Sequence, residues 1–300
     1  MYTIVGATGN TGRVVAERLL DEGREVRAIG RSEERLRPLA ERGAEPVVGA
    51  IEDPEFAVRA FDGATAAYSM IPPNYAAPEV RAWQSQVSRS IAEGLRASGV
   101  THVVNLSSVG AQLAEGTGPI AGLHEHEQRL NAIGDLHVLH LRPAWFMENF
   151  YAALDGIRAM DALVMPIRRD VPVAMIATRD IGEEAARRLL ELDFEGKGFQ
   201  ELLGAREVTL EEAAEVIGSA LGRPGLPYVE ASREQAREAL AEQGFPEAAI
   251  RSLLEMYDAF NTGRIAPEEP RAAASTTRTD LREFATNQML NVWEAGGAAR

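Results

Sequence analysis

The sequence predicts an α/β protein built on a doubly wound parallel β-sheet, with a smaller helix-rich C-terminal lobe. Short apolar runs alternate with longer amphipathic segments up to about residue 143, and this alternation then stops. Strands alternating with helices of this length indicate βαβ units, which form parallel sheets with right-handed crossovers. Three evenly spaced glycines after the first apolar run predict a ligand-binding turn at the start of the sheet.

The first half of the chain supplies the predicted sheet and the helices that cover it. Its strands are expected at residues 3–7, 24–30, 45–50, 64–71, 101–108 and 136–142. Its helices are expected at residues 11–23, 32–43, 54–63, 79–98 and 123–133. Ser32 is a suitable N-cap for the second helix, because a serine hydroxyl accepts hydrogen bonds from unpaired backbone N–H groups.

The sequence of the second half predicts a different order of elements, with fewer strands. Strands are expected at residues 171–177 and 199–204, helices at 178–192, 208–222 and 232–260, a loop at 266–277 and a last amphipathic segment. Thr178 or Asp180 is expected to cap one helix, and Thr209 with Glu212 forms a capping-box pattern in the next. We therefore predict a domain at 1–150 and a smaller lobe at 151–300, with interleaved contacts, packed over the carboxyl edge of the sheet.

The glycine-rich turn is the motif GATGNTG, which lies between the first strand and the first helix. Gly6 allows a tight turn, Gly9 allows the backbone to approach a diphosphate, and Gly12 allows close packing of the helix. The helix start directs free N–H groups and its positive dipole end at the phosphates. This context predicts a Rossmann-type dinucleotide site. The residues expected to form it are Gly6, Ala7, Thr8, Gly9, Asn10, Thr11 and Gly12.

The end of the second strand predicts which dinucleotide is bound. Sites for NAD usually have an acidic residue there, which accepts hydrogen bonds from the ribose 2′-OH. This chain has Arg31, with Arg35 nearby, and a guanidinium group suits the 2′-phosphate of NADP. We expect NADP(H) to be preferred over NAD(H); the alternative is a solvated arginine beside Glu33 and Glu34.

Other residues follow the carboxyl ends of the strands, where ligands of such sheets bind. Asp53 is expected either to face the adenine amine or to cap the helix that starts at Pro54. Pro72 has no N–H donor and would form a stiff wall near the nicotinamide ribose. The full set of further cofactor-site candidates is Asp53, Met70, Ile71, Pro72, Ser107 and Pro143.

Composition disfavours several classes of function. The net charge of −14 would repel nucleic acid phosphates, so we expect no direct nucleic acid binding. The absence of cysteine excludes disulfides and thiolate chemistry. No apolar run approaches the ~18 residues of a membrane-spanning helix, and no signal segment is apparent. We expect a cytoplasmic protein that binds a small molecule and that can form a homodimer.

The motifs GATGNTG, NLSSVGA and LRPAWFMENF, together with the arginine after the second strand, resemble the NmrA-like proteins, a branch of the atypical short-chain dehydrogenases. The resemblance covers nearly the whole chain. It implies an NADP-binding Rossmann domain, a small C-terminal lobe and a substrate cleft between them. The family includes NADPH-dependent quinone and azo-dye reductases as well as NADP-sensing regulators, so the resemblance implies one of these two functions.

The chain departs from the wider superfamily at the catalytic residues. No tyrosine is followed by lysine in the pattern Tyr-x-x-x-Lys, and Lys197 is the only lysine. His124 and His126 are the alternative proton donors, or they belong to a solvated helix start. Two residues apart on a helix, they point to different faces and do not form a metal site.

The substrate site is expected where the chain leaves the last strand of the first half. Trp145, Phe146 and Asn149 follow that strand, and Tyr75 lies on the opposite wall. Aromatic side chains there would form an apolar platform for a flat substrate; the alternative is packing between the lobes. We expect hydride transfer from NADPH to a quinone or similar planar acceptor. The alternative is a non-catalytic NADP sensor that acts through protein partners.

Overall fold

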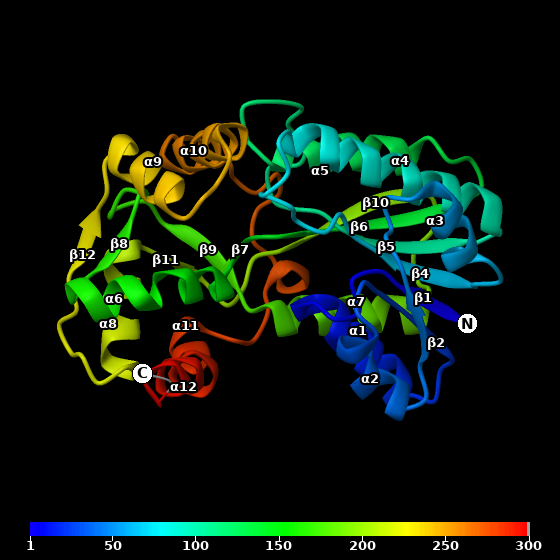
Figure 1. Ribbon diagram of the computed structural model, residues 1–300, viewed down its shortest axis with the longest axis horizontal. Coiled ribbons are helices and arrows are strands. Elements are labelled where there is room, and N and C mark those ends of the chain that lie inside the picture. The colour runs from blue at the N-terminus through cyan, green and yellow to red at the C-terminus, as the bar shows by residue number, and fades with distance from the viewer. Residues whose placement is uncertain (299–300) are drawn as a thin grey trace.

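A central sheet of seven parallel strands organises the structure, a computed structural model that describes residues 1–298 (Figure 1). The strand order is β10-β6-β5-β4-β1-β2-β3, and every neighbouring pair is parallel. The chain winds outward in both directions from β1 and β4, which confirms the doubly wound Rossmann-type sheet. The strands are β1 (Tyr2–Ile4), β2 (Val26–Gly30), β3 (Glu45–Val48), β4 (Ala66–Ser69), β5 (His102–Leu106), β6 (His137–Pro143) and β10 (Lys197–Leu202).

Helices cover both faces of this sheet. One face carries α1 (Asn10–Asp21), α2 (Glu33–Glu41) and α7 (Thr178–Glu191), and the other carries α3 (Pro54–Phe61), α4 (Val80–Ser98) and α5 (Ile120–Asn131) (Figure 1). The apolar stripes of α1 and α7 enter one core cluster with the strands, represented by Leu19 and Leu189, both fully buried. On the opposite face Phe61 and Ile91 fill a second cluster. Burial of these stripes is the main source of helix stability.

The C-terminal lobe has its own core and two small sheets. Trp145, Phe150, Ile217 and Phe284 are buried together in this core. The sheets are β11-β9-β7 and β12-β8. Their strands are β7 (Trp145–Phe146), β8 (Leu163–Met165), β9 (Val173–Ile176), β11 (Glu207–Val208) and β12 (Tyr228–Glu230). The helices are α6 (Leu154–Met160), α8 (Leu210–Ala220), α9 (Arg233–Glu242), α10 (Glu247–Asn261), α11 (Leu281–Phe284) and α12 (Leu290–Ala298), with 3₁₀ turns at Met147–Ala153 and Ala273–Ser275 and a π turn at Ala285–Met289.

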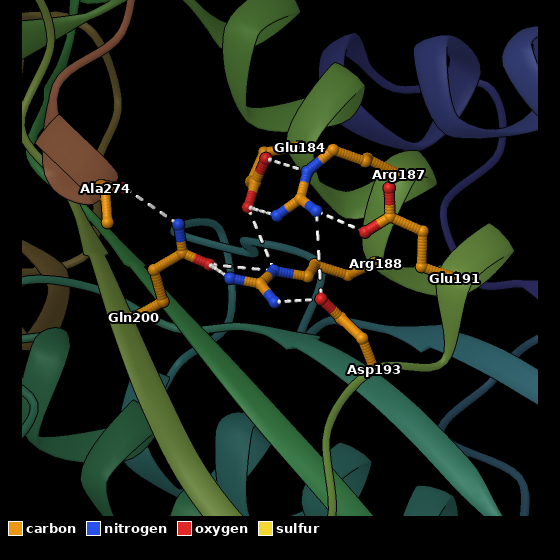
Figure 2. A network of polar contacts seen from close by, with 7 residues as sticks. All are labelled: Glu184, Arg187, Arg188, Glu191, Asp193, Gln200 and Ala274. Atoms are coloured by element: carbon orange, nitrogen blue, oxygen red, sulfur yellow. Dashed lines mark hydrogen bonds and ion pairs between the residues drawn. The ribbon is translucent and has the colours of Figure 1, made fainter.

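The chain returns from this lobe to the main sheet. The strand expected near 199–204 is β10, which pairs with β6 at the edge of the main sheet. Figure 2 shows the polar network that joins α7 to β10: Arg188 bonds Glu184, Asp193 and Gln200, and Gln200 donates to the carbonyl of Ala274. The contacts of the two parts therefore interleave, and the division at residue 150 stays a prediction.

Local signals explain two of the helix starts. Ser32 and Thr209 cap α2 and α8 as expected, accepting from the backbone N–H groups of Arg35 and Glu212 at 3.3 and 3.2 Å. The second half of the expected capping box does not form, because the Glu212 carboxylate accepts from Arg206 at 3.0 Å instead. The cap expected from Thr178 or Asp180 is wrong. The Glu148 carboxylate, from the neighbouring 3₁₀ turn, accepts from the Thr178 N–H at 3.0 Å instead.

Two further boundaries differ from expectation. The helical stretch expected at 232–260 is divided into α9 and α10, because the chain turns at Gly244 with φ +82° and Pro246 precedes the second helix. The fifth helix begins at Ile120, three residues before the expected start. No helix within residues 1–298 combines the length and apolar character required to cross a bilayer.

Candidate functional site

The glycine-rich turn folds tightly against its own backbone and against Met70. Gly6 has φ +69°, which glycine adopts without a Cβ clash. A Cβ on Gly6 would lie 2.6 Å from Met70 Sδ, and one on Gly12 would lie 2.4 Å from the Gly6 carbonyl oxygen. The Gly9 N–H donates to that same oxygen at 2.9 Å. Side chains at Gly6 and Gly12 would overlap Met70 and the backbone of the turn itself, so this tight turn requires glycine at both positions.

The N-terminus of α1 is left free for an anion. Gly9 occupies the N-cap position without a side-chain cap, and the first turn holds no acidic residue. Within residues 1–298, no acceptor pairs with the N–H groups of Asn10, Thr11 or Gly12, whereas the Arg13 N–H bonds the Gly9 carbonyl. Unpaired N–H groups and the helix dipole attract negative charge. The turn therefore fits the diphosphate of a dinucleotide.

Two guanidinium groups stand beside this turn. Arg31 follows β2; its Nη2 lies 2.8 Å from Glu52 Oε1, and its guanidinium lies 5.3 Å from the ring centroid of Trp83. The Arg35 Nη2 donates to the carbonyl of Thr8 at 3.2 Å. The Arg31 side chain is 56% exposed, so its outer face remains accessible. Of the two arginines predicted to receive a 2′-phosphate, Arg35 contacts the glycine turn and Arg31 contacts Glu52 after β3; their binding of the phosphate stays a prediction.

The loops after β3 and β4 form the next part of the site. Asp53 Oδ1 accepts from the N–H groups of Glu55 and Phe56 at 3.0 and 3.5 Å, so the structure uses Asp53 as the cap of α3. Its contact with adenine stays a prediction. Ile71 is buried, and the carbonyl of Pro72 accepts from the Trp83 indole N–H at 3.1 Å, which ties this loop to α4.

A buried ion pair holds the ends of β5 and β6. Glu127, on α5, is 1% exposed and accepts from Arg142 Nε at 2.9 Å and Nη2 at 2.7 Å. The Ser107 hydroxyl donates to the same carboxylate at 2.5 Å. The Arg142 Nη1 group donates to the Glu268 carboxylate at 2.7 Å. Burial alone would lower the pKa of Arg142, but the bonds to the carboxylates of Glu127 and Glu268 outweigh this effect. The pKa is therefore raised above its usual value, and Arg142 stays charged. Ser107 and the adjacent Pro143 are held rigidly at the carboxyl edge of the sheet.

The two candidate histidines have different surroundings, as their spacing predicted. His126 is fully buried; its Nδ1 lies 2.9 Å from the Ser88 hydroxyl, and burial lowers its pKa to about 3. It is neutral and enclosed, which argues against a role as proton donor. His124 is half-buried and its Nδ1 donates to the carbonyl of Ala111 at 2.8 Å. Among residues 1–298, no group of three His, Cys, Asp or Glu side chains is placed to hold a metal ion.

The predicted substrate residues have different surroundings, and no contact joins Tyr75 to the other three within residues 1–298. Tyr75 is half-buried, and its ring centroid lies 6.3 Å from that of Phe245. Phe245 belongs to the turn between α9 and α10. Burial raises the pKa of Tyr75, and the neighbouring Tyr257 raises it further. Trp145 is 7% exposed and packs edge-on against Phe150 with ring centroids 4.6 Å apart, so this arrangement favours packing.

Phe146, at the end of β7, and Asn149, in the 3₁₀ turn that follows, remain accessible. Phe146 is half-buried and packs at the margin of the first core cluster, as do Met70, Leu123 and Phe260. Asn149 is exposed. The contact of Phe146 or Asn149 with a substrate stays a prediction.

Several site residues were not found from the sequence. Glu52 pairs with Arg31 across two neighbouring loops, and Glu127 pairs with Arg142 from a helix to a strand, so no fixed spacing signals either pair. Phe245 and Tyr257 reach Tyr75 from the far lobe. Only Phe245 carries a local signal: it lies between Gly244 and Pro246, and glycine and proline this close together indicate a turn.

Comparison with known proteins agrees with this architecture. A reductase of Streptomyces griseus, (4-alkanoyl-5-oxo-2,5-dihydrofuran-3-yl)methyl phosphate reductase, is 30% identical over 279 residues, 93% of each chain. An NAD(P)H azoreductase of Xenophilus azovorans is 26% identical over 257 residues, 86% of each chain. A solved NADPH-dependent quinone oxidoreductase of Escherichia coli, complexed with NADPH, superposes with a TM-score of 0.81 at 22% identity, covering 96% of this chain and 100% of that one.

A family model spans almost the whole chain. Residues 2–285 match the model of the NmrA-like family. The match includes the glycine turn, both arginines beside it, the buried ion pair and most of the C-terminal lobe. The chain therefore belongs to the NmrA-like family.

Proposed function

We propose that the chain is an NADPH-dependent oxidoreductase that transfers hydride to a planar carbonyl acceptor such as a quinone. The observation that carries this proposal is the glycine turn, with its unpaired N–H groups and Arg31 and Arg35 beside it. The relatives described above include reductases that use NAD(P)H or NADPH, which supports the same chemistry.

Different residues would bind different parts of the cofactor. The N–H groups of Asn10, Thr11 and Gly12 would bind the diphosphate, and Arg31 with Arg35 would bind the 2′-phosphate. Ser107 and Pro143 would border the nicotinamide end, because Ser107 follows β5 and Pro143 ends the adjacent strand β6 at the carboxyl edge of the sheet. When bound, the nicotinamide supplies the hydride. The protein orients the acceptor and excludes water.

The acceptor side needs little acid–base machinery. A quinone is already electrophilic, so solvent or His124 can supply the proton that follows the hydride. The partly exposed apolar side chains Met70, Leu123, Phe146 and Phe260 each pack against the first core cluster, and they are the candidates to contact a flat ring. The Tyr75 hydroxyl would donate a hydrogen bond to the acceptor oxygen, since its raised pKa keeps it protonated.

The second candidate is an NADP sensor without turnover. It is favoured by the enclosure of His126 and by the absence of Tyr-x-x-x-Lys from the sequence. Mixing the protein with NADPH and a panel of quinones, while following the absorbance of reduced nicotinamide, separates the two functions. Oxidation of NADPH supports the reductase, and tight binding without oxidation across the panel supports the sensor.

Cofactor preference is tested by replacing Arg31. Loss of one charge-assisted bond removes ~1.5–3 kcal/mol, so Arg31→Ala should weaken NADP binding tenfold or more while changing NAD binding little. Calorimetric titration of both nucleotides measures this. Equal affinities for NADP and NAD in the unmodified protein would contradict the preference.

A further inference from the structure

Glu52 lies between β3 and α3, at the place where Arg31 would meet the adenosine ribose. Its side chain is 20% exposed, and its Oε1 accepts from Arg31 Nη2 at 2.8 Å. Its other oxygen, Oε2, is buried and has no hydrogen-bond partner in the part of the chain that the structure describes. A buried carboxylate oxygen without a donor is unfavourable. It indicates a partner that the protein itself does not provide.

The charge of Arg31 is already compensated in this arrangement. Glu52 neutralises it from one side, while the Trp83 ring lies 5.3 Å from the guanidinium. The backbone carbonyl of Glu52 is also held, by Gln86 Nε2 at 3.5 Å. A 2′-phosphate that approaches Arg31 therefore meets a fixed carboxylate of the same sign as itself. Like charges at this range oppose each other even near a protein surface.

An unphosphorylated ribose meets the opposite chemistry at the same two residues. Its 2′-OH is a hydrogen-bond donor, and carboxylates that accept from this hydroxyl are the usual determinant of NAD binding. The Glu52 carboxylate is 20% exposed and offers such an acceptor, and only one of its two oxygens is paired within the described residues. One ion pair thus offers a cation for the phosphorylated ribose and an acceptor for the unphosphorylated one.

We propose that Glu52 determines cofactor selectivity, accepting a hydrogen bond from the 2′-OH of NAD(H) and opposing the 2′-phosphate of NADP(H). The chain then binds both cofactors and prefers NADP(H) only modestly. This inference rests on the proposed dinucleotide site. It adds to that site a residue that acts against the preference given by Arg31.

Two substitutions separate the charge of Glu52 from its role as acceptor. Glu52→Gln removes the charge but keeps a carbonyl oxygen, so NADP⁺ should bind roughly three- to tenfold more tightly, with NAD⁺ little changed. Glu52→Ala removes the acceptor as well, so NAD⁺ should bind roughly three- to tenfold more weakly. Glu55→Gln is the matched control, because this exposed residue of α3 loses one negative charge without touching Arg31.

Calorimetric titration of each folded variant with NADP⁺ and with NAD⁺ gives the ratio of affinities. An increased ratio for both Glu52 variants, with the control unchanged, supports the inference. A ratio within about twofold of the unmodified protein in both variants overturns it. If the unmodified protein binds neither nucleotide, the proposed dinucleotide site itself fails, and this result differs from an unchanged ratio.

Discussion

Replacing Gly12 by alanine tests whether the glycine turn holds a dinucleotide. The added methyl group would lie 2.4 Å from the Gly6 carbonyl oxygen, 2.8 Å from its carbon and 3.2 Å from the Ala7 nitrogen. Ordinary contacts begin at 3.4 Å, so the turn and the start of α1 must separate by about 1 Å. All three neighbours are backbone atoms, and no side-chain rotation relieves the overlap.

The expected result is weaker NADPH binding in a protein that still folds. A shift of this size lengthens the bonds from the first N–H groups of α1 to the phosphates. Losing the equivalent of one charge-assisted bond removes about 1.5–3 kcal/mol, which is roughly 10- to 100-fold in affinity. Quenching of tryptophan fluorescence on titration with NADPH measures the affinity, and circular dichroism checks the fold.

Gly198→Ala is the matched control, because an added Cβ there meets nothing within 4 Å. It should leave NADPH affinity unchanged. A folded Gly12→Ala variant that binds NADPH within about twofold of the unmodified protein would refute the reasoning.

Three more predictions concern the buried polar groups and the acceptor side. Glu127→Ala should lower the free energy of unfolding in urea by about 3 kcal/mol because Arg142 stays buried without its main carboxylate. Glu211→Ala removes the carboxylate of an exposed ion pair with Arg169, whose side chains are 59% and 53% exposed, and should change it by less than about 1 kcal/mol; similar losses would contradict a special role for the buried pair. The pKa of His126 is about 3 in the folded protein and about 6.5 when unfolded. The contribution of His126 to the free energy of unfolding is therefore fully present above pH ~6.5 and is lost as the pH drops toward 3. In urea titrations, His126→Gln should reduce the dependence of the unfolding free energy on pH by up to about 1.4 kcal/mol per pH unit. An unchanged pH dependence would show that the ring is not enclosed. Tyr75→Phe should lower kcat/KM for a quinone roughly threefold or more by removing one hydrogen bond, without changing NADPH affinity; equal rates would exclude the hydroxyl from the acceptor site.

The fold could be predicted because its signals are local. The alternation of strands and helices and the glycine spacing are visible within short windows, and Ser32 and Thr209 carried their own capping signals. The place of β10 in the main sheet could not be predicted, because its partner β6 lies more than fifty residues earlier in the chain. Burial likewise depends on tertiary packing. His126 sits on a polar stretch of sequence, yet it is enclosed between α4 and α5.

The same contrast between local sequence signals and tertiary packing applies to the candidate site. Arg31 was predicted from its position after the second strand, but its pairing with Glu52 depends on how two loops meet. Ser107 was predicted from the end of its strand, whereas the carboxylate that binds it comes from α5. Position along a strand is encoded locally; the partner of a charged group is decided by the packing of distant elements.

Both borders of the main sheet are closed to further strands. At one border, Pro46 in β3 has no N–H to offer, and Glu45 beside it is charged and exposed. At the other, β10 is covered by the chain's own later segment: the Leu203 N–H bonds the carbonyl of Ser275, and Glu201 accepts from the N–H groups of Glu268 and Glu269. Blunted borders of this kind prevent edge-to-edge aggregation. A second copy of the chain that associates with the first is therefore not expected to extend the main sheet.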